Sequence, residues 1–254
     1  TELTETMAER PLAVRGRVAG NHLLYISPRW GEMDRQTIEK CIRLLEEEYG
    51  VPRRHEIDPV DLLVMTILSQ NTSDVNSLRA FAQLKSAFPS HEQILAAPEK
   101  AVAESIRGGG LADMKAGHIK EALAKIRQRE GRIDIGSLAG MDDEQAMEYL
   151  RSLPGVGPKT ASVVLLFAFG KSFLPVDTHV YRLSCRLGLL EDGVRPEKAQ
   201  AALEGIVPED RYLSLHLNLI NHGRRVCKAR GPRHERCVLR DCCDSFQRGL
   251  CQKA

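Results

Sequence analysis

The stretch that most constrains the fold of this chain is Leu153-Pro-Gly-Val-Gly-Pro158, near its centre. A polar, helix-forming segment precedes it, and a largely apolar run continues to Phe169. Glycines at alternate positions allow a sharp turn, and proline suits the first position of a new helix. The sequence therefore predicts two helices joined by a tight hairpin. The backbone N–H groups of Gly155, Val156 and Gly157 would suit a phosphate oxygen.

A second short motif, Val176-Asp-Thr-His179, follows the hairpin. Together with Leu153–Ala161, which reads Leu-Pro-Gly-Val-Gly-Pro-Lys-Thr-Ala, it resembles the endonuclease III family of the helix-hairpin-helix-GPD superfamily of DNA glycosylases. The resemblance extends more weakly from about residue 34 to the end. It implies an all-α fold with two lobes, a six-helix barrel and an iron–sulfur lobe.

The resemblance also implies a division of the chain into domains. Residues 55–171 would form the six-helix barrel that contains the hairpin. Residues 34–54 and 172–254 would form a discontinuous iron–sulfur cluster domain, with DNA bound between the two lobes. Residues 1–33 show no firm hydrophobic period, and we expect them to form an N-terminal extension.

The composition is ordinary for a globular protein, with 43% hydrophobic and 28% charged residues in a chain of 254. No apolar run approaches the ~18 residues that suggest a membrane span. No basic-then-apolar signal peptide opens the chain. We therefore expect no membrane partner, and we also expect a monomer. Its expected location is the cytoplasm, associated with the nucleoid in a bacterium, or another compartment that contains DNA.

The net charge of +2 conceals an asymmetry along the chain. Residues 223–254 contain nine Lys or Arg and three acidic residues, so this segment carries +6 and the remainder carries −4. A basic segment suits a polyanion. With the resemblance, the expected partner is double-stranded DNA that contains damaged bases or abasic sites. A solvated basic tail without a partner is the simpler alternative.

The loop Ser69-Gln-Asn-Thr-Ser-Asp74 ends a strongly apolar segment that we expect to form a central, buried helix. It matches a loop of the endonuclease III family in which a glutamine fills the gap left by an everted base. Asn71 stands at that position here, and either Asn71 or the adjacent Gln70 could fill the gap. Alternatively, the loop only caps the helix that follows.

A glycine-rich loop precedes a helix that we expect from about Ala116. Its match to the family implies that Leu111 is an exposed wedge, inserted into the DNA stack beside the extruded nucleotide. The same match implies that Lys115 faces a phosphate. Without the family, a leucine that follows three glycines would more simply tuck into a core.

Lys159 and Asp177 are the candidate catalytic residues. Breaking an N-glycosidic bond makes the sugar cation-like, and a nearby carboxylate can stabilise that charge. A neutral amine can attack C1′ and form a Schiff base. Lys159 lies in the first turn of a predicted helix, where the helix dipole disfavours an ammonium group. The resemblance makes Lys159 the nucleophile and Asp177 its acidic partner. Alternatively, Lys159 contacts a phosphate and Asp177 caps the helix that begins at Thr178.

This pair implies a base excision repair DNA glycosylase with AP lyase activity, which nicks the strand by β-elimination. Relatives that only remove the base lack a lysine at this position, so Lys159 favours the bifunctional class. Oxidised pyrimidines are the expected damaged bases. The alternative is a non-enzymatic helix-hairpin-helix DNA-binding protein that retains the scaffold. Lys159 together with Asp177 favours the enzyme, because a binding protein would need neither.

Five of the seven cysteines lie in the last 28 residues. In a chain without an export signal, such a group suggests a metal site before disulfides. The family motif Cys-x6-Cys-x2-Cys-x5-Cys, which binds a [4Fe–4S] cluster, falls here on Cys227, His234, Cys237 and Cys243.

The fourth ligand of this cluster stays open between His234 and Cys251. Cys242 is a further candidate, although it adjoins Cys243 and would point elsewhere if Cys243 binds. Three cysteines and a histidine would also suit zinc. Two histidines of the last long helix, His216 and His222, receive no role, because a single histidine on a helix is usually structural.

Overall fold

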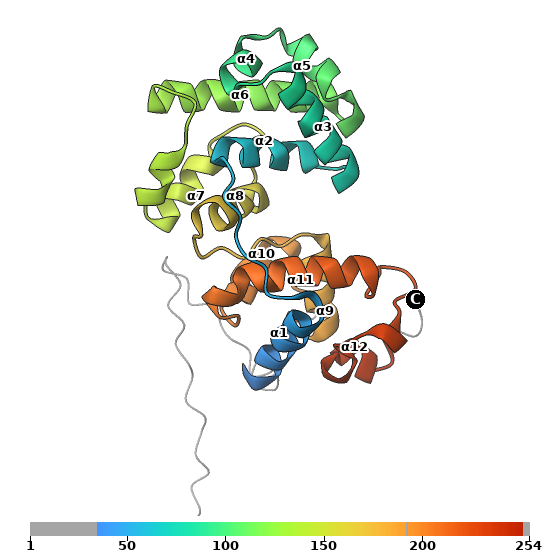
Figure 1. The fold of residues 1–254 in the computed structure, drawn as a ribbon. Coiled ribbons are helices and arrows are strands. Elements are labelled where there is room, and N and C mark those ends of the chain that lie inside the picture. The colour runs from blue at the N-terminus through green and yellow to red at the C-terminus, as the bar shows by residue number, and fades with distance from the viewer. Residues whose placement is uncertain (1–34, 192, 251–254) are drawn as a thin grey trace, which may run out of the picture. The chain divides into compact units, whose positions relative to one another are not determined.

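The computed structural model describes residues 35–191 and 193–250, and every regular element in these ranges is helical (Figure 1). The predicted all-α fold is therefore confirmed. The expected N-terminal extension, residues 1–33, lies outside the described residues. The α-helices are α1 (Arg35–Tyr49), α2 (Pro59–Ser69), α3 (Asp74–Ala87), α4 (His91–Ala96), α5 (Glu99–Ser105), α6 (Ala112–Glu130), α7 (Asp143–Arg151), α8 (Pro158–Val164), α9 (Thr178–Leu187), α10 (Pro196–Glu204), α11 (Tyr212–Arg225) and α12 (Asp244–Gln247).

A first hydrophobic core is built around α2, which contacts α3, α6 and α8. Asp58 caps α2 by accepting a hydrogen bond from the backbone N–H of Asp61, and Pro59 occupies its first position. Apolar residues on all sides of the helix are buried, which confirms the expected central helix. They are Val60, Leu62, Leu63, Val64, Ile67 and Leu68.

A second hydrophobic core combines α1 with α9, α10 and α11. Figure 1 shows α1 beside α11, although these two helices lie far apart in the sequence. The apolar face of α1 is buried here, and Glu46 on the same helix accepts hydrogen bonds from Ser214 and Arg211. The polar bonds fix how α1 docks, while apolar burial supplies most of the driving force.

The predicted helix from Pro158 to Phe169 changes character at Leu165. The α-helix ends at Val164 and continues as one π-helical turn, η4 (Leu165–Phe169), before Gly170 ends it with a φ of 68°. Leu165 packs in the first core and Leu166 in the second. The π turn therefore joins the two cores at consecutive residues. None of the described helices has the length and apolar character needed to cross a membrane.

Candidate active site and DNA-binding surface

The hairpin between α7 and α8 forms as the sequence predicts. Gly155 adopts a φ of 73°, and a Cβ added there would lie 2.7 Å from Nδ1 of His118, so this position requires glycine for two reasons. The N–H of Val156 donates to the carbonyl of Leu153 at 3.2 Å. In the described chain, the N–H groups of Gly155 and Gly157 donate to no other residue. A phosphate oxygen could accept hydrogen bonds from these two amides of the hairpin.

Asn71 and Leu111 are the only described non-glycine residues with positive φ, at 53° and 51°. Asparagine tolerates this left-handed conformation, whereas for a bulky residue such as leucine it is strained. Both side chains are exposed, and that of Leu111 is 52% exposed directly before α6. Strained residues of this kind are concentrated at functional sites. Two loops predicted to contact DNA thus each present one such residue.

Gln70 has a different role from Asn71 beside it. Its Nε2 donates to the carbonyl of Gly155 at 2.8 Å and to Oγ1 of Thr160 at 3.3 Å. Gln70 therefore ties the end of α2 to the hairpin, and its amide nitrogen is already engaged. Of the two residues considered for the gap of an everted base, Asn71 is the exposed one.

The prediction that Lys115 faces a phosphate is wrong, because its side chain is only 1% exposed. Its Nζ donates to the carbonyl of Leu68 at 2.7 Å and to that of Gly109 at 2.9 Å. Burial lowers the pKa of Lys115. The ammonium group bridges the end of α2 and the glycine-rich loop, and so holds the backbones beside Asn71 and Leu111 together.

Lys159 is the second residue of α8, and its side chain is exposed. Asp177 caps α9, because its Oδ1 accepts hydrogen bonds from the backbone N–H groups of His179 at 2.8 Å and Val180 at 2.7 Å. Both bonds end on Oδ1, so in the described chain Oδ2 of Asp177 keeps no hydrogen-bond partner and can face a ligand.

His216, to which sequence analysis gave no role, lies beside this pair. Burial lowers its pKa to about 4, and among the neighbouring charges Asp177 acts to raise that pKa while Lys159 acts to lower it. The ring hydrogen-bonds the carbonyl of Pro175 through Nδ1 at 2.8 Å and contacts Phe167 edge-on. A neutral imidazole thus supports the extended segment that carries Asp177.

A basic hollow lies at the end of α11. Its cationic lining consists of Arg224, Arg225, Lys228, Arg233 and Arg236. Tyr49 lines it as well, and the guanidinium of Arg225 lies 5.8 Å from the centroid of the Tyr49 ring. Five of the nine cations of the basic C-terminal segment therefore line one concave surface, together with Glu48, and can meet the phosphates of one strand.

The four motif residues Cys227, His234, Cys237 and Cys243 line a single pocket of about 270 Å³ of empty space, part of it open to solvent. Among the described residues, no three of their ligand atoms lie within 4.8 Å of one another. The pocket also includes Arg233, Arg240 and Phe246. Cys251 lies outside the described residues.

Two hydrogen-bond donors reach the sulfurs of this pocket. Arg186 donates to Sγ of Cys227 at 3.2 Å, and Nε2 of His222 lies 3.3 Å from Sγ of Cys237. Burial lowers the pKa of His222 to about 4, and the hydroxyl of Tyr49 lies 2.9 Å from its Nδ1. With Tyr49 as donor, the neutral imidazole carries its hydrogen on Nε2, facing the sulfur. Such donors stabilise thiolate ligands.

Cys242 points away from the pocket, as expected if Cys243 is a ligand. Its Sγ lies 2.9 Å from Sγ of Cys41 on α1, and both residues are buried. Sequence analysis missed this contact, because the partner is 201 residues away.

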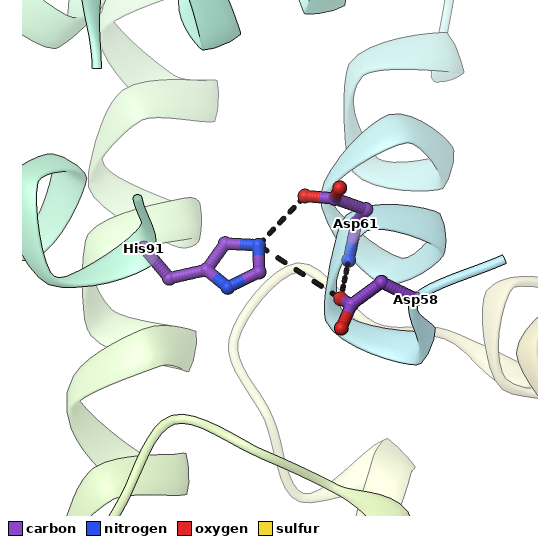
Figure 2. Close-up of side chains that lie close together, drawn as sticks. All are labelled: Asp58, Asp61 and His91. Carbon is purple, nitrogen blue, oxygen red and sulfur yellow. Dashed lines mark hydrogen bonds and ion pairs between the residues drawn. The ribbon is translucent and has the colours of Figure 1, made fainter. Parts of the chain in front are cut away.

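A second group of residues that could hold a metal ion consists of Asp58 and Asp61 at the start of α2 and His91 at the start of α4 (Figure 2). Nε2 of His91 is 2.7 Å from Oδ1 of Asp61, and Nζ of Lys85 donates to the same oxygen at 2.9 Å. Asp58 is engaged as the cap of α2. The ammonium group of Lys85 already binds Oδ1 of Asp61, the oxygen that His91 also contacts. The group therefore acts as a polar junction between α2, α3 and α4.

Comparison with known proteins places these features in a family context. The sequence model described as HhH-GPD superfamily base excision DNA repair protein matches residues 64–209. The endonuclease III of Thermotoga maritima is 34% identical over 213 residues, which cover 83% of this chain and 94% of that protein. The similarity therefore spans both hydrophobic cores.

Solved structures agree with this comparison. A non-covalent endonuclease III–DNA complex has 26% sequence identity and a TM-score of 0.74, and the match covers 85% of this chain and 98% of that chain. A trapped endonuclease III–DNA covalent intermediate has 27% identity and the same TM-score of 0.74, over 85% of this chain and 99% of that chain. The helical arrangement in Figure 1 is thus that of proteins solved with DNA.

Proposed function

The chain belongs to the HhH-GPD superfamily of base excision DNA repair proteins and is an endonuclease III-type DNA glycosylase and AP lyase, and we propose that Lys159 and Asp177 perform its chemistry. One observation carries this assignment. Lys159 is presented at the start of α8, and Asp177 keeps one carboxylate oxygen unengaged at the start of α9. The charges of both residues act on the pKa of the same buried ring, that of His216, which supports their assignment to one site.

The reaction follows from the properties of these two groups. Bound DNA covers the exposed Lys159 and supplies the desolvation that favours its neutral amine. Asp177 stabilises the sugar as it becomes cation-like, and the amine attacks C1′ as the protonated base leaves. The sugar ring opens to give a Schiff base. Loss of a proton from C2′ then expels the 3′ phosphate by β-elimination, and water hydrolyses the imine to regenerate Lys159.

Extrusion of the damaged nucleotide falls to Leu111 and Asn71. Leu111 enters the base stack, and Asn71 fills the space that the everted base leaves. The amides of Gly155 and Gly157 hold a phosphate near the site, and the basic hollow at the end of α11 binds the backbone further along. Lys115 takes no phosphate in this scheme but fixes the positions of the two loops.

A [4Fe–4S] cluster fits the cysteine pocket better than a single zinc ion. Zinc holds its ligands at about 2.0–2.3 Å, so four ligand atoms around one ion would lie within about 4.6 Å of one another. Among the described residues, no three of the ligand atoms here meet that spacing. Cys227, Cys237 and Cys243 would hold the cluster, with His234 or Cys251 as the fourth ligand. The cluster would pin the basic segment that it encloses, and the lysine chemistry requires no redox step from it.

We further assign the two hydrophobic cores to two lobes, a barrel over residues 55–171 and a cluster domain over residues 34–54 and 172–254. The enzyme acts on damaged duplex DNA in a compartment that contains DNA, and oxidised pyrimidines are the proposed substrates. A panel of duplexes, each with one lesion, scored separately for base release and for strand nicking, tests this function. We expect release and nicking with oxidised pyrimidines. Binding without release of any lesion would instead support the DNA-binding protein.

A further inference from the structure

The contact between Cys41 and Cys242 joins two distant parts of the chain. Their sulfur atoms are 2.9 Å apart, closer than the ~3.5–4.0 Å at which even nonbonded carbon atoms make their best contacts. Cys41 lies in α1, and Cys242 ends the short helical turn η7 (Arg240–Cys242), one residue before Cys243. A disulfide bond is about 2.05 Å long, so a small shift of both side chains would close the gap.

Neither sulfur has a competing assignment. Cys242 turns away from the pocket lined by Cys227, Cys237 and Cys243, and Cys41 lies on another helix. The residues are 1% and 7% exposed, for Cys41 and Cys242 respectively. Cys242 is the less buried of the two, and such burial disfavours the approach of a bulky thiol. The surroundings therefore favour reaction of the two cysteines with each other over reaction with a partner in solution.

We propose that Cys41 and Cys242 form an intramolecular disulfide in response to a small peroxide, and that this bond clamps η7 onto α1. The thiol of Cys242 attacks one oxygen of hydrogen peroxide. The O–O bond breaks, a sulfenic acid forms and one water leaves. The thiol of Cys41 then attacks the sulfur of Cys242, the S–O bond breaks, and a second water leaves as the S–S bond forms. Two thiols lose two electrons, the peroxide gains them, and a dithiol reductant reverses the change.

The clamp would join η7 to α1 by a covalent bond. α1 is already bound to α11 through Glu46, but the turn that precedes Cys243 contacts α1 through this sulfur pair. The bond would close a loop spanning 201 residues, and a disulfide constrains the unfolded chain more as its loop lengthens. Oxidation should therefore stabilise the fold and hold Cys243 in place.

Peptide mapping of the purified, metal-loaded protein tests this proposal. The protein is treated with a small excess of hydrogen peroxide, remaining thiols are alkylated, and the chain is digested with trypsin without reduction. Only samples that keep their visible absorbance are analysed. The expected product joins residues 41–43 to residues 241–248, with fragmentation between Cys242 and Cys243 placing the bond on Cys242. The oxidised protein should unfold about 5–10 °C higher than the reduced protein.

Cys41→Ser and Cys242→Ser should each abolish the linked peptide and the rise in unfolding temperature. Cys185→Ser, which changes a cysteine of α9 outside this pair, should keep both. If wild-type protein gives no linked peptide while peroxide oxidises other cysteines, or if the link persists in Cys242→Ser, the proposal is overturned. The wild-type peptide map decides the matter even if one serine variant fails to fold. Lesion processing by the reduced protein is a separate measurement, so failure of the clamp and failure of the proposed function are distinguishable.

Discussion

Leu111 combines features that packing alone does not explain: an exposed apolar side chain, a left-handed backbone and a place directly before α6. Truncation removes the wedge but leaves the charged surfaces intact. Leu111→Ala should therefore lower the rate of lesion processing by roughly 10-fold or more, because unstacking a base costs a few kcal/mol that the wedge no longer offsets. Binding to undamaged duplex should change little.

A matched control for Leu111 is Leu78 on α3, which is also exposed but has an ordinary helical backbone. Leu78→Ala should leave lesion processing within about twofold of wild type, since exposed substitutions away from special features have small effects. Single-turnover rates on one lesion and affinities for undamaged duplex give both quantities. An equal loss of processing and of non-specific binding in Leu111→Ala would show that Leu111 is a packing residue.

His216 predicts a pH dependence of stability. Burial holds its folded pKa at about 4, below the ordinary 6.5 that it regains in the unfolded chain. Between these values the unfolded chain binds a proton that the folded chain does not, so acid favours unfolding. The stability contributed by keeping this ring neutral is complete above pH 6.5 and is lost as the pH falls to about 4.

The measurement is the free energy of unfolding against pH for wild type and for His216→Asn. The amide of asparagine can still donate to the carbonyl of Pro175 but does not titrate. The variant should lose stability less steeply over this pH window, whatever its stability at neutral pH. An unchanged slope would mean that folding does not lower the pKa of His216.

Gln70 and Lys115 show what the sequence could not reveal at this scale. The motifs identified both loops as important, but the bonds of these side chains run to Gly155, 85 residues away, and to Leu68, 47 residues away. No local pattern encodes such contacts. A lysine that ties carbonyls together and a lysine that meets a phosphate look identical in sequence. Asn71 and Leu111 were identified through the family loops, and their exposure and backbone conformation support the roles proposed for them.

At the scale of elements, the hairpin between α7 and α8 predicts a specific sensitivity. Gly155→Ala places a Cβ against His118 and strains a φ of 73°. Gly131 at the end of α6 has nearly the same φ, 75°, but open space around it, so Gly131→Ala is the matched control. The backbone strain, about 1 kcal/mol, should be common to both variants.

Only Gly155→Ala should also weaken DNA binding and lesion processing, because the hairpin must shift to relieve the clash and its amides then miss the phosphate. Thermal unfolding and duplex affinity, measured for both variants, separate the two effects. Equal duplex affinity in Gly155→Ala and Gly131→Ala would argue against a phosphate site at the hairpin.

Helix positions were largely predictable, and the exceptions have local causes. α6 begins at Ala112 rather than near Ala116, because Leu111 itself ends the glycine loop with a left-handed residue and the helix starts directly after it. The π turn after α8 was also missed; it lies where Leu165 packs in the first core and Leu166 in the second. The hydrophobic periodicity of a sequence indicates one buried face of a helix. It does not indicate where a helix passes from one core to another.

For the whole molecule, the proposed cluster makes a prediction about metal content. The purified protein should be yellow-brown and contain about four irons per chain. If His234 is the fourth ligand, His234→Ala should lose iron while Cys251→Ala keeps it, and the reverse pattern would identify Cys251. Colourless protein with one zinc per chain would contradict the cluster assignment.

The central claim, that the amine of Lys159 attacks C1′ beside Asp177, is tested most directly by borohydride trapping on an abasic duplex. Borohydride reduces the imine, so wild type should give a stable protein–DNA adduct whose modified peptide contains Lys159. Lys159→Gln should abolish the adduct while duplex binding persists through the basic hollow. Asp177→Asn should slow base removal more than cleavage at a preformed abasic site. Wild-type protein that binds the abasic duplex but gives no adduct, or an adduct that survives in Lys159→Gln, would contradict the account.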